Sequence, residues 1–163
     1  MQALEGMGEA SFEMGHYRDA RRYLARASRE GVLSTQSQMR LETATLILES
    51  DPMEPHLSGQ ERVRRTLQDF AQSMERLSGC AAARGVSLEN DTQQSDLQKM
   101  HALALALQPK MRDRNLARDP DLLMKVIDLV YEVEKVTERA CGEPQGLDLA
   151  LLLLSRAQEG GNQ

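Results

Sequence analysis

Apolar side chains recur every three or four positions along most of the chain, which is the spacing of amphipathic α-helices. The longest run begins after Ser58 and continues to Ala81. Its apolar members are Val63, Leu67, Phe70, Met74, Leu77 and Ala81. Another run follows Asp119-Pro120, where Asp suits the N-cap and Pro the first position of a helix. Its members are Leu122, Val126, Val130, Val133 and Val136, with Leu123, Ile127 and Leu129 widening the apolar face.

Helix-breaking residues divide the pattern into segments. The seven helices that we predict cover about residues 2–14, 17–29, 34–50, 58–81, 97–111, 119–141 and 146–158. Ser34 is the expected N-cap of the third, and Ser58 with Glu61 has the form of a capping box. Pro109 is expected to kink its helix. The connections are short, so the pattern predicts an all-α, antiparallel stack of helical hairpins.

Composition narrows the possible functions. Aromatic residues make up 3% of the 163 residues and Trp is missing, so a β architecture is not expected. The net charge of −5, with acids interleaved among the arginines, argues against a nucleic-acid partner. The most apolar run, Leu147 to Leu154, is too short to span a membrane. We expect a binding protein without a membrane span in this chain.

Small and aromatic residues at the start of the chain carry a family resemblance. Gly8 follows Met7, Gly15 precedes Tyr17 by two positions, and Ala20 and Ala27 lie on the next helix. It is the spacing of these residues along the chain that carries the resemblance. Residues 1–34 resemble one tetratricopeptide repeat, a helix–turn–helix unit of roughly 34 residues. Ser11, Leu24 and the Val32-Leu33 pair depart from the family pattern, and the motif does not continue beyond residue 34.

The resemblance implies a domain organisation. Residues 1–34 form a helix pair, the end of an α-solenoid; residues 35–158 form a divergent helical region packed on it as one continuous domain, and 159–163 a disordered tail. A single repeat cannot bury its own faces, so further repeats are expected before it in a longer parent protein. The remainder faintly resembles the end of bacterial repeat proteins that carry an export signal or a membrane anchor.

The resemblance also implies a site. Repeats of this family bind peptides on the surface lined by the first helix of each pair, which here includes Glu5, Glu9, Phe12 and Glu13. Three carboxylates on that surface would favour a basic partner. The alternative is that these glutamates form an ordinary solvated helix face.

Two cysteines, Cys80 and Cys141, lie near predicted helix ends. Neither has a CxxC partner, so they are either buried small residues or a disulfide that closes a loop of about 60 residues. The buried alternative is compatible with the bacterial cytoplasm and the disulfide with the periplasm or another extracytoplasmic space. His16, His56 and His101 show no ligand spacing, and we expect no metal and no cofactor.

No sequence motif indicates catalysis. An arginine cluster could bind an anion, but acids interrupt it, so solvated helix faces are the simpler interpretation; its members are Arg62, Arg64, Arg65, Arg112, Arg114 and Arg118. We therefore expect a non-catalytic interaction scaffold that binds a protein or peptide. The alternative is an oligomerisation domain in which the Leu-rich helix after Gly146 pairs two copies into a homodimer.

Overall fold

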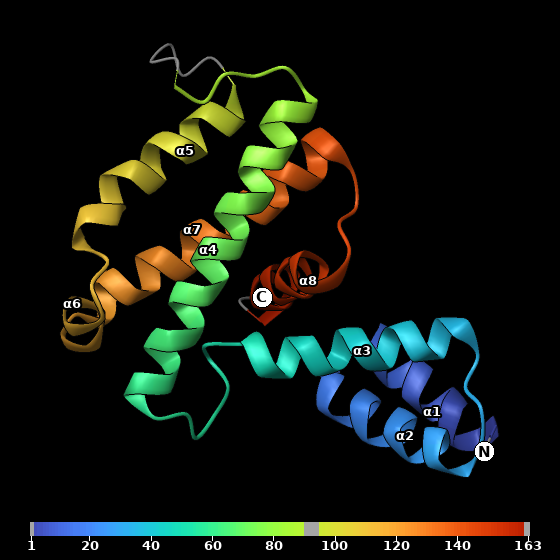
Figure 1. Cartoon of the computed structure of the whole chain (residues 1–163). Helices are drawn as coiled ribbons and strands as arrows, with labels where there is room; N and C mark the ends of the chain where they lie inside the picture. The colour runs from blue at the N-terminus through green and yellow to red at the C-terminus, as the bar shows by residue number, and fades with distance from the viewer. Residues whose placement is uncertain (1, 90–94, 162–163) are drawn as a thin grey trace. The chain divides into compact units, whose positions relative to one another are not determined.

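The computed structural model describes residues 2–89 and 95–161, and the regular elements in this part of the chain are all helical. Its eight α-helices are α1 (Gln2–Glu13), α2 (Tyr17–Glu30), α3 (Thr35–Ser50), α4 (Gly59–Ala83), α5 (Asp96–Leu107), α6 (Asp113–Arg118), α7 (Pro120–Cys141) and α8 (Gly146–Gly161) (Figure 1). The prediction of an all-α fold is confirmed.

The chain divides into two compact units, Met1–Glu49 and Ser50–Gln163. The predicted helix pair, residues 1–34, lies within unit 1. This unit also includes α3, because hydrogen bonds from Ser34, Ser37 and Arg40 join α3 to α1. We call Met1–Glu49 unit 1 and Ser50–Gln163 unit 2.

In unit 1, α1 and α2 pack against each other as a hairpin. Gly15 lies in the turn with a φ of 76°, a left-handed conformation that glycine adopts without a steric penalty. Gly8 lies against α2, because a Cβ atom added to it would be 2.5 Å from Cγ of Leu24. Ala20, Leu24 and Ala27 share one face of α2 and have no exposed surface. Glycine and alanine thus permit the close approach of the two helices.

Replacing Gly8 by Ala should lower the free energy of unfolding of unit 1 by roughly 1–3 kcal/mol, the usual cost of overpacking a closed contact. The new methyl group would overlap Leu24, whose side chain is fully buried and cannot move aside. The matched control is Gly6→Ala on the same helix, where nothing lies within 4 Å. Gly6→Ala should leave stability unchanged or raise it through helix propensity. Urea unfolding measures both, and equal effects of the two substitutions would contradict the packing described.

In unit 2, the long helices α4 and α7 pack against each other, with α5, α6 and α8 around them. Figure 1 shows α4 crossing α7. The buried apolar residues on the two helices are Val63, Phe70, Leu77, Cys80, Ala81, Leu122, Leu123, Val126, Ile127, Leu129, Val130, Tyr131, Val133 and Val136. The predicted stripes therefore form much of this core, although Leu67 and Met74 are only partly buried. Cys80 and Cys141 form a disulfide with an S–S distance of 2.00 Å, which links the C-terminal ends of α4 and α7.

Helix starts follow the predicted caps with one exception. The predicted N-caps are confirmed at Ser34, whose Oγ accepts a hydrogen bond from Ser37 N–H, and at Asp119, whose carboxylate accepts one from Leu122 N–H. Of the two hydrogen bonds in the capping box predicted at Ser58 and Glu61, one forms and the other does not. Ser58 Oγ accepts from Glu61 N–H, but the Glu61 carboxylate binds two arginines instead of the backbone. A complete capping box forms where the sequence analysis saw none, between Ser95 and Gln98.

The helix predicted over 97–111 with a kink at Pro109 is wrong. α5 ends at Leu107, a 3₁₀ turn spans Gln108–Lys110, and α6 is separate, so the described residues contain one helix more than the seven predicted. Pro109 has no N–H group to donate and its ring crowds the preceding turn, which ends the α-helix here.

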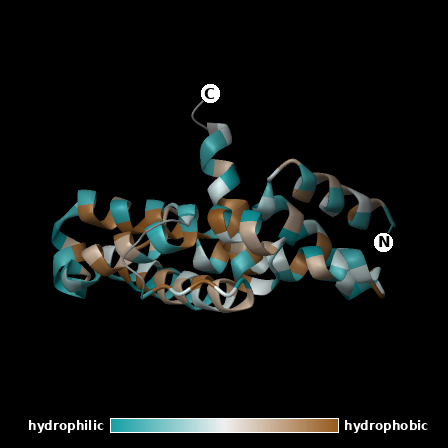
Figure 2. Cartoon of the chain, turned by 90° about the horizontal axis from the view of Figure 1, so that it is seen from above, coloured by the Kyte–Doolittle hydropathy of each residue, from teal (hydrophilic) through white to brown (hydrophobic). Residues whose placement is uncertain are grey.

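The last helix combines an apolar first half with a polar second half, a change that Figure 2 shows along α8 toward the C-terminus. Leu151 and Leu152 have no exposed surface, and Leu154 keeps 7%. α8 continues through Gly161, so the prediction of a disordered tail is wrong for residues 159–161; residues 162–163 lie outside the described residues. None of the helices described is both long and apolar enough to cross a membrane.

Candidate functional site

The carboxylates predicted on α1 lie along the side that faces α3. Glu5 accepts a hydrogen bond from Ser34 N–H at 2.9 Å, and Glu9 accepts one from Ser37 Oγ at 2.8 Å. Ser34 is the N-cap of α3 and Ser37 lies in its first turn, and a negative charge is favourable at this end of a helix. Accordingly, the hydrogen bonds from Ser34 and Ser37 lower the pKa of Glu5. Glu5 and Glu9 thus attach the beginning of α3 to α1.

Arg40 on α3 extends the contact between α1 and α3 toward the C-terminal end of α1. It donates to Glu13 at 2.9 Å, lies 3.8 Å from Glu9, and its guanidinium is 5.6 Å from the ring centroid of Phe12. The ring of Phe12 also meets Tyr17 edge to face at 5.3 Å. The structure therefore brings Glu5, Glu9, Phe12 and Glu13 together on one side of α1. This side contacts α3 and its N-cap. Because Arg40 neutralises part of the acidic surface, these residues offer a basic partner less charge than the sequence implies.

A different side of α1 is left exposed. Ala3, Met7 and Ala10 on α1, and Met14 directly after it, follow one another at helical spacing and are all exposed. Met7 keeps 43% and Met14 62% of its surface accessible. We call these residues the α1 stripe. The regular alternation of Ala and Met is visible in the sequence, whereas the family resemblance implied a site at the glutamates.

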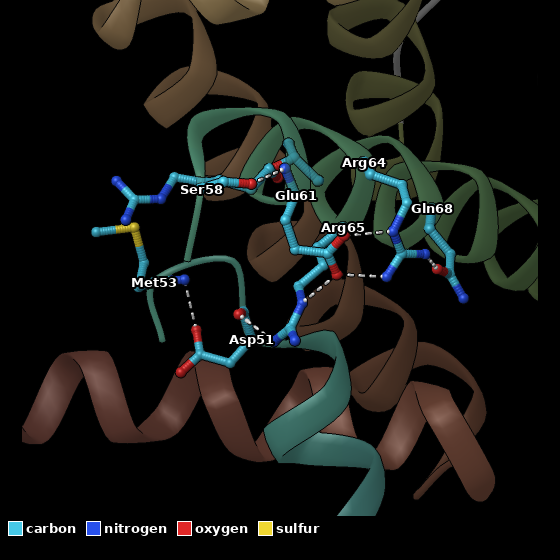
Figure 3. Close-up of polar contacts among 9 residues, drawn as sticks. Asp51, Met53, Ser58, Glu61, Arg64, Arg65 and Gln68 are labelled. Atoms are coloured by element: carbon cyan, nitrogen blue, oxygen red, sulfur yellow. Dashed lines mark hydrogen bonds and ion pairs between the residues drawn. The ribbon is translucent and has the colours of Figure 1, made fainter. Parts of the chain in front are cut away.

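The arginines at the start of α4 form a network within unit 2 (Figure 3). Glu61 accepts hydrogen bonds from Arg64 at 2.6 Å and from Arg65 at 3.1 Å, and Arg65 also donates to the backbone carbonyl of Asp51 at 3.0 Å. Hydrogen bonds from Arg64 and then Arg65 lower the pKa of Glu61 to about 2. Two arginines of the suspected anion site thus already bind a carboxylate. The other predicted members on and beside α6 are exposed: Arg112, Arg114 and Arg118.

Arginines also cover α2, where the sequence analysis did not single them out. Arg22 pairs with Asp19 at 3.0 Å and Arg26 with Glu30 at 3.4 Å. All four side chains are more than 40% exposed, so these pairs contribute little to stability. This surface has the character of a solvated helix face.

An apolar groove lies between α5 and α7 in unit 2, with a volume of about 350 Å³. Its apolar lining consists of Met100, Leu103, Ala106, Leu107 and Leu129. Leu103 keeps 52% of its surface exposed. Lys125, Asp128 and Glu132 of α7 line the groove as well. The sequence does not predict this groove, because the groove depends on how two helices meet and not on either helix alone.

Two carboxyl groups are buried in unit 2. Glu134 on α7 has no exposed surface, and neither of its carboxylate oxygens has a hydrogen-bond partner. Burial, reinforced by the negative charge of Asp148, raises its pKa to about 8, although Arg76 opposes this shift. Asp69 on α4 is 3% exposed; burial and the charge of Asp51 raise its pKa to about 8. With Thr66 and Tyr131, Asp69 also lines a gap that is too small to hold a water molecule.

The histidines and cysteines provide no metal centre among the residues described, where no three His, Cys, Asp or Glu side chains lie together suitably. His16 and His56 are exposed, and His101 is within hydrogen-bonding distance of the Leu88 carbonyl at 3.1 Å.

Comparisons with protein-family models, with curated proteins and with solved structures gave no match to this chain.

Proposed function

We propose that this chain is a non-catalytic interaction scaffold, and that unit 1 binds a helix of a partner protein along the α1 stripe. The observation that carries this proposal is the row of exposed apolar side chains Ala3, Met7, Ala10 and Met14. Isolated apolar residues are common on protein surfaces, but a continuous row at helical spacing is the usual docking surface of another helix.

The chemistry of the α1 stripe suits such a partner. Alanines let a second helix approach closely, while the unbranched, polarisable methionine side chains adapt their shape to different neighbours. α1 packs through Gly8 against the buried face of α2, and this contact holds the helix that carries the stripe in place.

Unit 1 also supports the proposed likeness to a tetratricopeptide repeat. α1 and α2 form a hairpin with glycine at the close contact, and α3 lies alongside α1 through the bonds of Glu5, Glu9 and Glu13. A third helix beside the first is the arrangement expected where the next repeat begins. We propose that unit 1 is one such repeat followed by the first helix of another.

The Cys80–Cys141 disulfide supports an oxidising compartment, because cytoplasmic reductants keep most such cysteines reduced. We therefore propose that the scaffold works outside the cytoplasm.

Site-specific photocrosslinking in the native cell tests the proposed function. A photoreactive residue at Met14 should yield one defined adduct that a second crosslinker at Met7 reproduces. Met39 on α3 provides the control, because it is 58% exposed but lies outside the stripe. A crosslinker at Met39 should not yield that adduct. Adducts at Met39 equal to those at Met14 would show non-specific contact and would refute the proposal.

The alternative, pairing of two copies through the leucines of α8, has less support. Leu151, Leu152 and Leu154 are buried within the chain. Pairing through them would require α8 to leave its contacts with α7 and α4.

A further inference from the structure

We propose that the groove between α5 and α7 is a two-fold symmetric interface between two copies of this chain. In this interface the Leu103 side chains occupy the centre, and Lys125 of each copy pairs with Asp128 of the other. The proposal concerns unit 2 and a second copy, so it is independent of the partner proposed for the α1 stripe.

The apolar lining supplies the first argument. Met100, Leu107 and Leu129 line the groove, and Leu103 is half exposed beside them. Leu103 of one copy can therefore insert into the groove of the second copy while it still lines the groove of its own chain. Burial of such apolar surface is the main favourable contribution to most protein associations.

The charges at the groove supply the second argument. Lys125 and Asp128 are both exposed and lie one helical turn apart. Within residues 2–89 and 95–161, neither side chain forms an ion pair or a hydrogen bond. In a two-fold interface, if residue i of one copy contacts residue j of the other, then j also contacts i. When two α7 helices pair antiparallel, Lys125 of each copy therefore meets Asp128 of the other copy.

The same charges favour a second copy over a foreign protein. The next acid on this side of α7, Glu132, is already paired with Lys135 at 2.5 Å. The unpaired charges at the groove are thus one cation and one anion, with no excess of either sign. A strongly basic or strongly acidic partner would leave one of them repelled, whereas a second copy satisfies both.

Charge reversal tests the pairing directly. Sedimentation equilibrium of the purified chain, up to high micromolar concentrations, should show a monomer–dimer equilibrium. Lys125→Glu alone and Asp128→Lys alone should each raise the dissociation constant roughly tenfold or more, because each turns two attractive contacts into two repulsive ones. The double variant, in which both charges are exchanged, should restore the dissociation constant of the unmodified chain.

A matched pair of leucine variants tests the apolar part. Leu103→Glu should abolish the dimer in the measured range, since it places a charge in the groove. Leu105→Glu should not, because Leu105 is 54% exposed on the same helix but does not line the groove. Far-ultraviolet circular dichroism and thermal melts confirm that each variant is folded. A monomer at every concentration would overturn the proposal. So would a dimer that withstands Leu103→Glu, or a double variant no tighter than the single ones.

Discussion

Replacing Glu134 by Gln should raise the free energy of unfolding by up to about 5 kcal/mol at alkaline pH and leave it nearly unchanged at acidic pH. Gln has the size of a protonated Glu, so the packing between α4 and α7 is preserved. The difference lies in the charge: an ionised Glu134 has no exposed surface and no hydrogen-bond partner for either oxygen. Keeping such a group charged inside a protein is costly.

The direction in which stability changes with pH follows from how many protons the folded and unfolded chains bind. Burial raises the pKa of Glu134 from 4.5 to about 8 in the folded chain. At pH values below 4.5 both states carry the proton and the group does not affect stability. Between 4.5 and about 8 the unfolded chain releases its proton while the folded chain retains it, so stability falls as pH rises. Each pKa unit corresponds to about 1.4 kcal/mol, which sets the upper limit given above.

Chemical unfolding across the acidic-to-alkaline range measures this effect. The unmodified chain should lose stability as pH rises, and Glu134→Gln should flatten that slope. Asp69→Asn should act in the same direction, because burial raises the pKa of Asp69 from 3.8 to about 8 as well. Glu143→Gln, at an exposed position, corrects for the change in net charge. An unchanged slope in both buried variants would refute the description of these two carboxyl groups.

Removing the disulfide should lower the free energy of unfolding of unit 2 by about 4 kcal/mol. Cys80 and Cys141 are 61 residues apart, and the bond restricts that loop in the unfolded chain. Without it the unfolded state gains conformational freedom, while α4 and α7 still pack against each other in the folded state. Double substitution to Ala is the cleanest change, since Cys80 is only 2% exposed and Ala fits its place.

Urea unfolding with and without a reductant measures the disulfide's contribution. The reductant should lower the midpoint of the unmodified chain to that of Cys80→Ala/Cys141→Ala and should leave the double variant unaffected. Alkylation of the denatured, unreduced chain provides the control, because it should label no thiol. Two labelled thiols, or equal midpoints under both conditions, would contradict the link between the two helix ends.

Much of the helical pattern follows from local chemistry. Ser34 and Asp119 cap helices as their types and positions predict, and the apolar stripe after Asp119 is buried. The break at Pro109 could not be read from apolar spacing, because Leu107 and Met111 continue the period of four across it. Spacing shows which residues share a face, and it does not show whether the backbone between them remains helical.

The candidate sites were harder to predict, because they depend on contacts between distant segments. The sequence placed Glu5, Glu9 and Glu13 on one side of a helix but could not show that Ser34, Ser37 and Arg40 would meet them there. Glu134 had a sequence signal, since it continues the spacing of Ile127 and Val130 on the buried face. A charged residue is nevertheless expected at the surface unless a partner is known.

The function proposed for unit 1 requires that the α1 stripe binds a partner helix. The most direct test is the affinity of the purified partner, once crosslinking has identified it, for three forms of this chain. Isothermal titration calorimetry would compare the unmodified chain with Met14→Glu and Met39→Glu, whose methionines are 62% and 58% exposed. Met14→Glu should weaken binding roughly tenfold or more, because a charge enters an apolar contact, while Met39→Glu should leave the affinity unchanged. Equal affinities for all three forms would contradict binding along the α1 stripe.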